Sequence, residues 1–215
     1  MIREVDGLVI RNFKPGDLKQ VASIMASSFR DELLKLINLT EDQMVDFLIE
    51  TGEVFPHSFP GYIVAEKNGE LLGLMKLSWS KQDKPKVRFP ILKILHYGWL
   101  TTIKLLVMRY LFPEKPIKGA CHVAEIAIIQ RVRRKGIAIK LLCYGKEIAI
   151  NNGLTRYTLN VDASNDAAFN LYKKLGFKIE KRRRNLMARW LLGVKEWYFM
   201  SQHLNQSMQM KNNSG

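Results

Sequence analysis

Two successive pairs of a strand-like run and a helix-like run constrain this chain more than any other feature. CHVAEIAII is a short apolar run typical of a buried strand, and GIAIKLLCYGKEIAINNG after it carries apolar residues at helical spacing. RYTLNVDA is again strand-like, and SNDAAFNLYKKLGF is a helix that we expect Ser164 to cap. Strands and helices that alternate in this way indicate layers of helix packed on a sheet.

The rest of the chain adds elements of both kinds. In order, they are a strand in LVIRNF, a helix in KPGDLKQVASIMASSF, a second helix from Thr40 with a Thr40–Gln43 capping box, a hairpin turning at Asn68-Gly69 and a last strand in KEWYFMSQHL. The predicted fold class is therefore α/β (α+β), with a mixed central β-sheet and helices on both faces. At 215 residues, the chain suits one domain with its own core.

The formal net charge of +14 favours anionic partners, which include a phosphorylated cofactor, nucleic acid and an anionic membrane surface. Cys121 and Cys143 are the two cysteines, and neither a metal-ligand nor a CxxC spacing joins them. We therefore expect no metal site, a reducing cytoplasmic setting and two thiols packed as small apolar groups. The first residues, MIREVDGLVI, contain no apolar signal-peptide core.

The seam between CHVAEIAII and the helix after it is basic and contains one glycine. It is formed by Arg133, Arg134, Lys135, Gly136, Ile137 and Ala138. The first N–H groups of a helix have no partner inside the helix and point outward at the positive end of its dipole, so they bind anions readily. Small residues at Gly136 and Ala138 would let a diphosphate approach these amides. The alternative is that Gly136 only shapes the turn and the cations form a solvated surface.

This seam and the later helix both match signatures of a known family. EIAIIQRVRRKGIA resembles the acetyl-CoA signature R/Q-x-x-G-x-G/A of the GNAT N-acetyltransferases, with Arg133, Gly136 and Ala138 at its fixed places. SNDAAFNLYKKLGF resembles the family's second signature, N-x-x-A-x-x-L-Y-x-K-x-G-F. The matching residues there are Asn165, Ala168, Leu171, Tyr172, Lys174, Gly176 and Phe177.

The resemblance covers residues 8–80 and 120–204. It implies one GNAT domain over residues 1–205, with a helical insert at about 85–118 that the family pattern lacks and a disordered tail at 206–215.

The resemblance also implies where acetyl-CoA, the co-substrate, would bind. In this family the two central strands splay apart and the pantetheine arm lies between them. The backbone of Ile126, Ala127 and Ile128 would then bind the arm, and the turn amides from Arg133 to Ala138 would hold the diphosphate. Asn165 would meet the cofactor near the second splayed strand.

Acyl transfer to an amine needs a base for the amine proton, a donor for the oxyanion and an acid for the leaving thiolate. Tyr172 stands at the family's tyrosine position, which implies the general acid; the alternative is a core tyrosine. Glu125 is a lone carboxylate in an apolar run, where relatives often carry a catalytic glutamate, so it is the candidate general base. The alternative is a strand-end residue in a surface salt bridge. Asn160, at a position where some relatives place the glutamate, cannot replace it, and His122 is either a proton relay or structural.

Residues 88–113 are the least family-like part of the chain. As one helix they form an apolar stripe of Leu92, Leu95, Trp99, Ile103, Leu106 and Tyr110, although Gly98 can break the helix into a pair. Charges interrupt the apolar run, so it does not read as a membrane span. Three interpretations stay open: packing over the acceptor cleft or at a homodimer interface, a lid for an apolar acceptor, and docking on a membrane surface through flanking cations. Those cations are Lys84, Lys86, Arg88 and Lys115.

Three functions compete on this evidence. The first is an N-acetyltransferase that uses acetyl-CoA to modify a small-molecule or peptide amine. The second is a CoA-binding relative without catalysis. The third is a basic membrane-surface or nucleic-acid-binding protein, which the run KIEKRRRN would serve. No nucleic-acid motif appears, and the cofactor already accounts for cations, so we expect no nucleic-acid partner.

Overall fold

The computed structural model describes residues 3–5, 7–30, 39–54, 57–83, 91–104, 117–184 and 196–204. The strands are β1 (Arg3–Val5), β2 (Leu8–Asn12), β3 (Tyr62–Lys67), β4 (Glu70–Trp79), β5 (Ala120–Ile128), β6 (Arg156–Asp162), β7 (Lys178–Arg183) and β8 (Trp197–His203). The helices are α1 (Leu18–Ser28), α3 (Glu41–Glu50), α4 (Ile91–His96), α6 (Ile137–Asn151) and α7 (Asp166–Lys174), with 3₁₀ turns at Pro15–Asp17 and Gln130–Val132.

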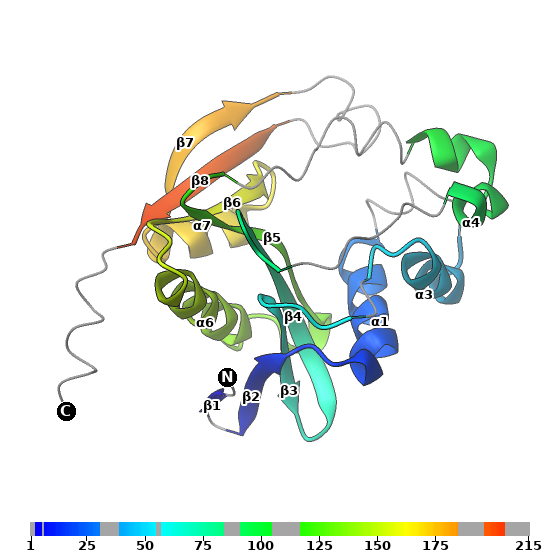
Figure 1. The fold of residues 1–215 in the computed structure, drawn as a ribbon, viewed down its shortest axis with the longest axis horizontal. Helices are drawn as coiled ribbons and strands as arrows, with labels where there is room; N and C mark the ends of the chain where they lie inside the picture. The colour runs from blue at the N-terminus through cyan, green and yellow to red at the C-terminus, as the bar shows by residue number, and fades with distance from the viewer. Residues whose placement is uncertain are drawn as a thin grey trace.

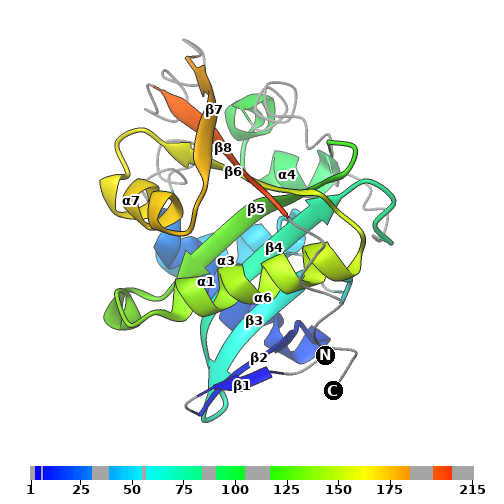
Figure 2. The ribbon, with the colours of Figure 1, turned by 90° about the vertical axis from the view of Figure 1, so that its left-hand side faces the viewer.

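The strands form one eight-stranded sheet in the order β1-β2-β3-β4-β5-β6-β8-β7 (Figure 1). β5 and β6 run parallel, and the other neighbouring pairs are antiparallel. α6 crosses one face of the sheet, and α1 and α3 lie on the other face (Figure 2). This arrangement confirms the predicted mixed sheet with helices on both faces.

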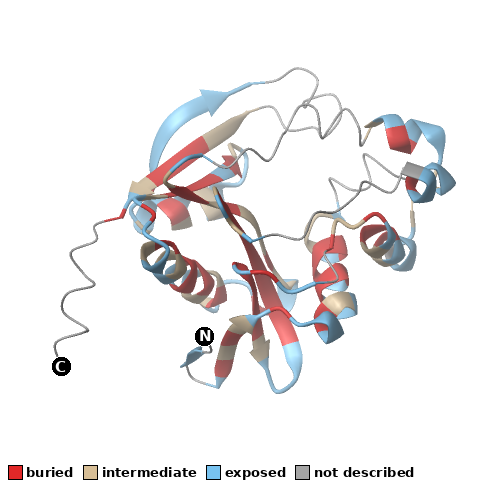
Figure 3. Ribbon diagram, in the orientation of Figure 1, coloured by how far each residue is buried: buried red, intermediate tan, exposed pale blue. Residues whose placement is uncertain are grey.

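Each face of the sheet has its own core. The α6 core includes Leu141, Leu142 and Tyr157, and the α1 core includes Val21, Phe47 and Leu74. Figure 3 shows the buried strand segments between the helices that cover them. The helices are therefore amphipathic covers on a central sheet, as their sequence periodicity predicts.

Local signals in the sequence appear as expected at two places. Thr40 caps α3, because its hydroxyl accepts from Gln43 N at 3.4 Å and its own N–H donates to Gln43 Oε1 at 3.0 Å. The β3–β4 hairpin turns at Asn68 and Gly69, whose φ values are 53° and 79°. Such positive φ values are what a two-residue hairpin turn requires, so the capping box and the hairpin are both confirmed.

Two short strands escape the sequence prediction. β1 and β7 form the outer edges of the sheet, each paired with a single neighbour. Every residue of β7 is exposed, so this strand lacks the alternation of apolar and polar residues that marks a half-buried strand. Its cationic run, part of the KIEKRRRN of the sequence, is exposed to solvent and is carried on an edge strand.

α6 lies close to the sheet because Gly145 has no side chain at the contact. A Cβ built on Gly145 would lie 2.5 Å from Tyr157 Oη and 2.6 Å from Met75 Cε, both too short for real atoms. The same helix begins at the glycine turn, so this contact also sets how the turn sits relative to β5. Cys143 on α6 is exposed, which corrects the expectation that both thiols are packed; Cys121 is buried.

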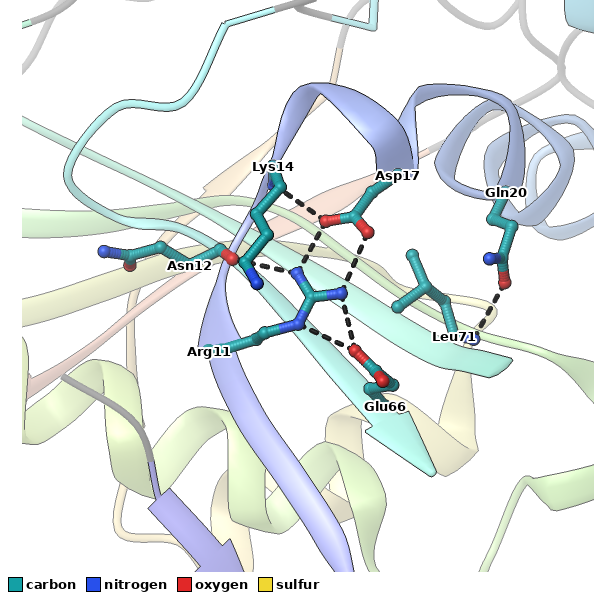
Figure 4. A network of polar contacts seen from close by, with 7 residues as sticks. All are labelled: Arg11, Asn12, Lys14, Asp17, Gln20, Glu66 and Leu71. Atoms are coloured by element: carbon teal, nitrogen blue, oxygen red, sulfur yellow. Dashed lines mark hydrogen bonds and ion pairs between the residues drawn. The ribbon is translucent and has the colours of Figure 1, made fainter. Parts of the chain in front are cut away.

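A buried charge network joins β2, β3 and the start of α1 (Figure 4). Arg11 donates to both oxygens of Asp17, at 2.6 and 2.9 Å, and its Nε donates to Glu66 Oε2 at 2.7 Å. The N–H of Lys14 also donates to Asp17, at 2.7 Å. Burial alone would raise the pKa of Asp17, but these hydrogen bonds outweigh it and hold the pKa below its usual value. The network fixes α1, whose C-terminal end reaches Phe29.

The described part of the insert is a broken helical pair. α4 ends before Gly98, which has a φ of 101°, and residues 99–104 are helical again. The prediction of one continuous helix is therefore wrong at Gly98, while the alternative of a pair is right. Ile94 is fully buried, whereas Leu92 and Trp99 of the predicted apolar stripe are exposed. The stripe residues Leu106 and Tyr110 lie outside the described residues, as do Lys84, Lys86, Arg88, Lys115 and the tail at 206–215.

Within the described ranges, none of the helices combines the length and the hydropathy needed to cross a bilayer. The same residues contain no group of three or more His, Cys, Asp or Glu side chains that is able to hold a metal ion.

Candidate active site

The two central strands separate halfway along their length. β5 and β6 are paired from Ala120↔Arg156 to Val123↔Leu159, and beyond these residues they do not pair. β5 nevertheless stays paired with β4 as far as Ile128, and β6 stays paired with β8 as far as Asp162. The two strands therefore diverge while each stays paired with its other neighbour in the sheet, which confirms the predicted splay.

A cavity of about 210 Å³ lies at this gap. Residues from β5, β6, α7 and the end of α1 line it: Phe29, Val123, Ala124, Glu125, Ile126, Leu159, Asn160, Val161, Asp162, Asn165, Ala168 and Tyr172. The cavity thus brings together both predicted catalytic residues, Glu125 and Tyr172, from opposite sides of the split. It also includes Ile126 and Asn165 of the predicted cofactor site.

A β-bulge at Ala124 changes which way β5 presents its side chains. Lys76 of β4 pairs with Glu125 and Leu77 pairs with Val123, so Ala124 is an extra residue. Before the bulge, Val123 belongs to the α6 core; after it, Ala127 belongs to the α1 core and Ile126 packs against the α6 core. The extra residue therefore moves Glu125 to the α1 side of the sheet.

Glu125 forms an ion pair inside the sheet. Lys76 Nζ lies 3.1 Å from Glu125 Oε1, and the two side chains are 6% and 21% exposed. The sequence-based alternative placed Glu125 at a strand end in a surface salt bridge, but Glu125 lies within β5 and its partner is the buried Lys76. Because Glu125 also lines the cavity, the ion pair orients a carboxylate at the place where a substrate amine would enter.

Tyr172 combines a buried ring with a place on the cavity wall. It packs into the α6 core, where its ring centre lies 5.9 Å from that of Phe177 and the two ring planes make an angle of 62°. Burial raises the pKa of its phenol to about 12. The phenol therefore stays protonated at neutral pH and is available as a hydrogen-bond donor to the cavity.

The basic turn begins α6 with two left-handed residues. Arg134 has a φ of 64° and Gly136 a φ of 80°, and a Cβ added at Gly136 would meet nothing within 4 Å. The first helical hydrogen bond runs from Lys140 N to Gly136 O, so the amides from Ile137 to Ile139 precede the helical bonding pattern. Arg133 donates from Nε to Ile128 O at 3.1 Å and so ties the turn to the end of β5.

The exposure of the turn residues agrees with this geometry. Arg133, Arg134 and Lys135 are exposed, Gly136 and Ala138 are half-buried and Ile137 is buried. The turn thus presents free helical amides, open space and exposed cations in one place. This combination suits a phosphate-bearing ligand.

Asn165 caps α7, where the sequence suggested Ser164. Asn165 Oδ1 accepts from Ala168 N at 3.0 Å, whereas Ser164 donates its N–H and hydroxyl to Asp162 Oδ1, each at 2.8 Å. The expectation for Ser164 is therefore wrong by one residue. Asn165 uses its side-chain oxygen for the cap while it borders the cavity.

His122 is held by neighbouring polar groups. Its Nδ1 lies 3.0 Å from Thr158 Oγ1, and its Nε2 lies 3.4 Å from the amide nitrogen of Asn160. The Thr158 hydroxyl donates to Cys121 O at 3.3 Å, so it accepts from His122, and Nδ1 carries the proton. Both ring nitrogens are thereby occupied, which favours the structural interpretation of His122 over a proton relay.

Reasoning from the sequence missed Lys76 and the bulge. Lys76 is 49 residues from Glu125 in the chain, and nothing in its own strand marks it as a partner. A charged residue inside the apolar run ELLGLMKLSW was the one available clue.

The sheet split between β5 and β6 and the helix that begins at a turn with open amides define an α/β fold that is shared by a class of acyltransferases. A sequence profile of the Acetyltransferase (GNAT) family matches residues 29–177. The chain belongs to this family.

Two characterised relatives refine the comparison. The N-alpha-acetyltransferase of Sulfurisphaera tokodaii is 31% identical over 162 residues, which is 74% of this chain and 80% of that protein. N-alpha-acetyltransferase 30 of Schizosaccharomyces pombe is 34% identical over 61 residues, covering 28% of this chain and 41% of that protein.

Solved structures support the fold. Ard1 from Thermoplasma volcanium superposes with a TM-score of 0.57 at 18% identity, covering 93% of this chain and 99% of that one. The PaiA N-acetyltransferase of Thermoplasma acidophilum, solved with coenzyme A, gives a TM-score of 0.56 at 14% identity, covering 92% and 99%. At these identities the likeness shows the fold alone.

Proposed function

We propose that this chain transfers the acetyl group of acetyl-CoA to the N-terminal α-amine of a peptide, with Glu125 as general base and Tyr172 as general acid. The observation that carries the proposal is the cavity between β5 and β6, which brings the carboxylate and the phenol together at the split of the sheet. The Sulfurisphaera tokodaii relative, an N-alpha-acetyltransferase, supports the choice of acceptor.

The described residues fit acetyl-CoA. The turn from Arg133 to Ala138 offers helical amides and cations to the diphosphate, and the open space at Gly136 leaves room for it. Beyond Val123, the β6-facing backbone of β5 meets no strand, so Ile126, Ala127 and Ile128 have groups to offer the pantetheine amides. Asn165 borders the same gap on the α7 side.

Glu125 would accept the proton that the amine must lose. An α-amine has a pKa of about 7.7–8.0 and a lysine side chain one of about 10.4, so both arrive largely protonated at neutral pH. The Lys76 ion pair holds the carboxylate on the α1 side of the gap. The neutral amine then attacks the thioester carbonyl, whose developing negative charge a backbone N–H beside the split would stabilise.

Tyr172 would protonate the departing thiolate. Its phenol is neutral over the working pH range because its pKa is about 12. Its ring is fixed in the α6 core, so the donor needs no reorganisation when the thiolate forms.

The test is an acceptor panel read out by release of CoA. Peptides with free N-termini should be acetylated, and the same peptides with blocked N-termini and an internal lysine should not. Mass spectrometry of the product locates the acetyl group. Acetylation of lysine or of small amines alone would refute the acceptor class, and binding of acetyl-CoA without turnover on any amine would favour the non-catalytic relative.

We also propose a reducing, cytoplasmic setting. Both cysteines are free thiols, and burial raises the pKa of Cys121 to about 12, so this thiol is unreactive in the folded chain. Alkylation of the native protein should modify Cys143 and leave Cys121 untouched. Modification of neither cysteine or of both would contradict the expected difference in reactivity between the two thiols.

A further inference from the structure

Most of the large apolar side chains that the described residues expose lie in one short segment. Five of the eight are within residues 92–103, and we call them the insert patch: Leu92, Leu95, Trp99, Leu100 and Ile103. Their exposed fractions run from 45% to 84%. Apolar side chains scattered singly over a surface are ordinary, whereas a cluster of this kind marks an interaction site.

The segment is anchored from the inside, so the patch is a defined outer surface. Ile94 is fully buried in the α1 core. Tyr97 donates its hydroxyl to Glu50 Oε2 at 2.8 Å and meets the ring of Phe47 edge-on at 5.0 Å. The helical pair thus packs against α3 through one side and turns its other apolar side outward, at the margin of the molecule (Figure 3).

The segment that carries the patch is strongly one-sided in charge along the sequence, whereas α3 beside it brings the acidic Asp46 and Glu50 near Tyr97. Residues 81–118 contain nine Lys or Arg and two Asp or Glu, a net charge of +7, which is half of the formal +14 of the whole chain. No acidic residue occurs between Asp83 and Glu114. Lys93 is exposed between Leu92 and Leu95, so a cation stands within the patch itself.

These features indicate what covers the insert patch. A second copy of the chain would bring the same formal net charge of +14, which opposes association of two copies. An anionic bilayer attracts the cations and accepts the apolar side chains below its headgroups. Trp99 suits that boundary, because the indole ring is apolar with one polar N–H.

We propose that the insert patch docks this acetyltransferase on an anionic membrane surface, with Leu92, Leu95, Trp99, Leu100 and Ile103 inserted and Lys93 among the headgroups. The contact is peripheral, and it is separate from the cavity at the β5–β6 split. It stands apart from the proposed acceptor, because docking does not depend on which amine is acetylated.

Co-sedimentation of the full chain with lipid vesicles tests the proposal. Vesicles of phosphatidylcholine and phosphatidylglycerol in equal parts should bind the chain, and vesicles of phosphatidylcholine alone should not. Binding should weaken as salt rises from about 0.1 M to about 1 M, where the Debye length falls from ~10 Å to ~3 Å. Tryptophan emission should shift to shorter wavelength on binding, and this shift should be lost in a variant without Trp99, which is one of four tryptophans.

Variants distinguish the contribution of the patch to vesicle binding from the contribution of the overall charge. The double variant Leu92→Gln/Trp99→Gln should lower partitioning into anionic vesicles by roughly tenfold or more, since both side chains lose their apolar contact with lipid. Ile179→Gln, which removes an exposed apolar side chain from β7, is the matched control and should bind like the wild type. Circular dichroism verifies folding, and CoA release on a soluble peptide should be unchanged in all variants, which separates failure here from failure of the proposed function.

Three outcomes would overturn the proposal. If the double variant binds as well as the wild type, charge alone holds the chain on the vesicle and the patch is not inserted. The wild type would fail to bind anionic vesicles at low salt if the patch had another occupant. Light scattering would show a dimer that the double variant abolishes, without vesicle binding, if that occupant were a second copy.

Discussion

Replacing Glu125 removes one half of an ion pair as well as a candidate base, so loss of activity in Glu125→Gln alone has two explanations. The variants Lys76→Met and Lys76→Met/Glu125→Gln resolve them. The first removes the other half of the pair and leaves the carboxylate in place. The double variant removes both charges, so it leaves no unpaired buried group but still lacks the carboxylate.

The exposures in the structure set the expected stabilities. Breaking a buried ion pair costs about 3–5 kcal/mol when one charge is left behind. Glu125→Gln removes a charged partner of the 6% exposed ammonium of Lys76, so we expect a loss of about 3 kcal/mol in the free energy of unfolding, or a fall in Tm of roughly 6–12 °C for a domain of this size. Lys76→Met strands a 21% exposed carboxylate beside a cavity and should cost less, about 2 kcal/mol. The double variant should lie within about 1 kcal/mol of the wild type.

Activity should follow a different order if Glu125 is the base. Glu125→Gln and the double variant should both lose about 100-fold or more in turnover near neutral pH, although the double variant regains its stability. The loss should be largest at low pH and shrink as pH passes the pKa of the acceptor amine, at about 8 for an α-amine. Melting curves paired with pH–rate profiles on a peptide acceptor measure both quantities. A double variant that recovers wild-type turnover, or a rate loss that is the same at every pH, would refute the base role.

Three further changes have definite expected outcomes. Gly136→Asn should keep the left-handed turn and weaken acetyl-CoA binding in calorimetry at least tenfold by filling the approach to the amides, whereas Gly153→Asn, at the other end of α6 with equally open space, should not change it. Tyr172→Phe should keep cofactor affinity and lower turnover about 100-fold; wild-type turnover would mean that another group protonates the thiolate. Asp17→Asn should lower the free energy of unfolding by about 1.5–3 kcal/mol at neutral pH, because Arg11 loses a charged acceptor. The folded-state pKa of Asp17 lies below its ordinary value of 3.8, so this advantage of the wild type is fully present above pH 3.8 and is lost as pH falls through the folded pKa; a difference in urea titrations that is the same at every pH would contradict the assignment.

Periodicity and capping signals were enough to predict most of the fold. The hairpin at Asn68, the capping box at Thr40 and the alternation of strands and helices after residue 120 are local patterns, and each is present in the structure. β7 was missed because it is exposed on every side, so burial leaves no pattern in its sequence. Ser164 and Asn165 are both good capping residues, so the sequence alone cannot decide which of them caps α7. The backbone geometry decides in favour of Asn165.

The candidate site was predictable in its residues but not in its geometry. The segments that resemble the GNAT family pointed to Glu125, Tyr172 and the turn. In the structure, Glu125 and Tyr172 line one cavity, and the turn is tied to the end of β5 through Arg133. The Lys76 partner depends on strand pairing between distant segments, and the bulge at Ala124 is a matter of register. Neither is encoded in a pattern that can be read along one strand. The outward side of the insert was also not readable, because its sequence is apolar on nearly every side.

The bulge at Ala124 also governs how β5 can change over generations. Loss of Ala124 would join Val123 to Glu125, which already pair with the neighbouring residues Leu77 and Lys76, so the bulge would close and the side chains beyond it would keep their faces. Loss of any other single residue of β5 would exchange the two faces of the strand from that point on, unless the bulge were lost with it. A length change in β5 is therefore confined to one position, whereas the insert can lengthen or shorten without moving the strand. We expect insertions and deletions among descendants of this sequence to accumulate around residues 81–118 and, within residues 120–128, to be restricted to the bulge.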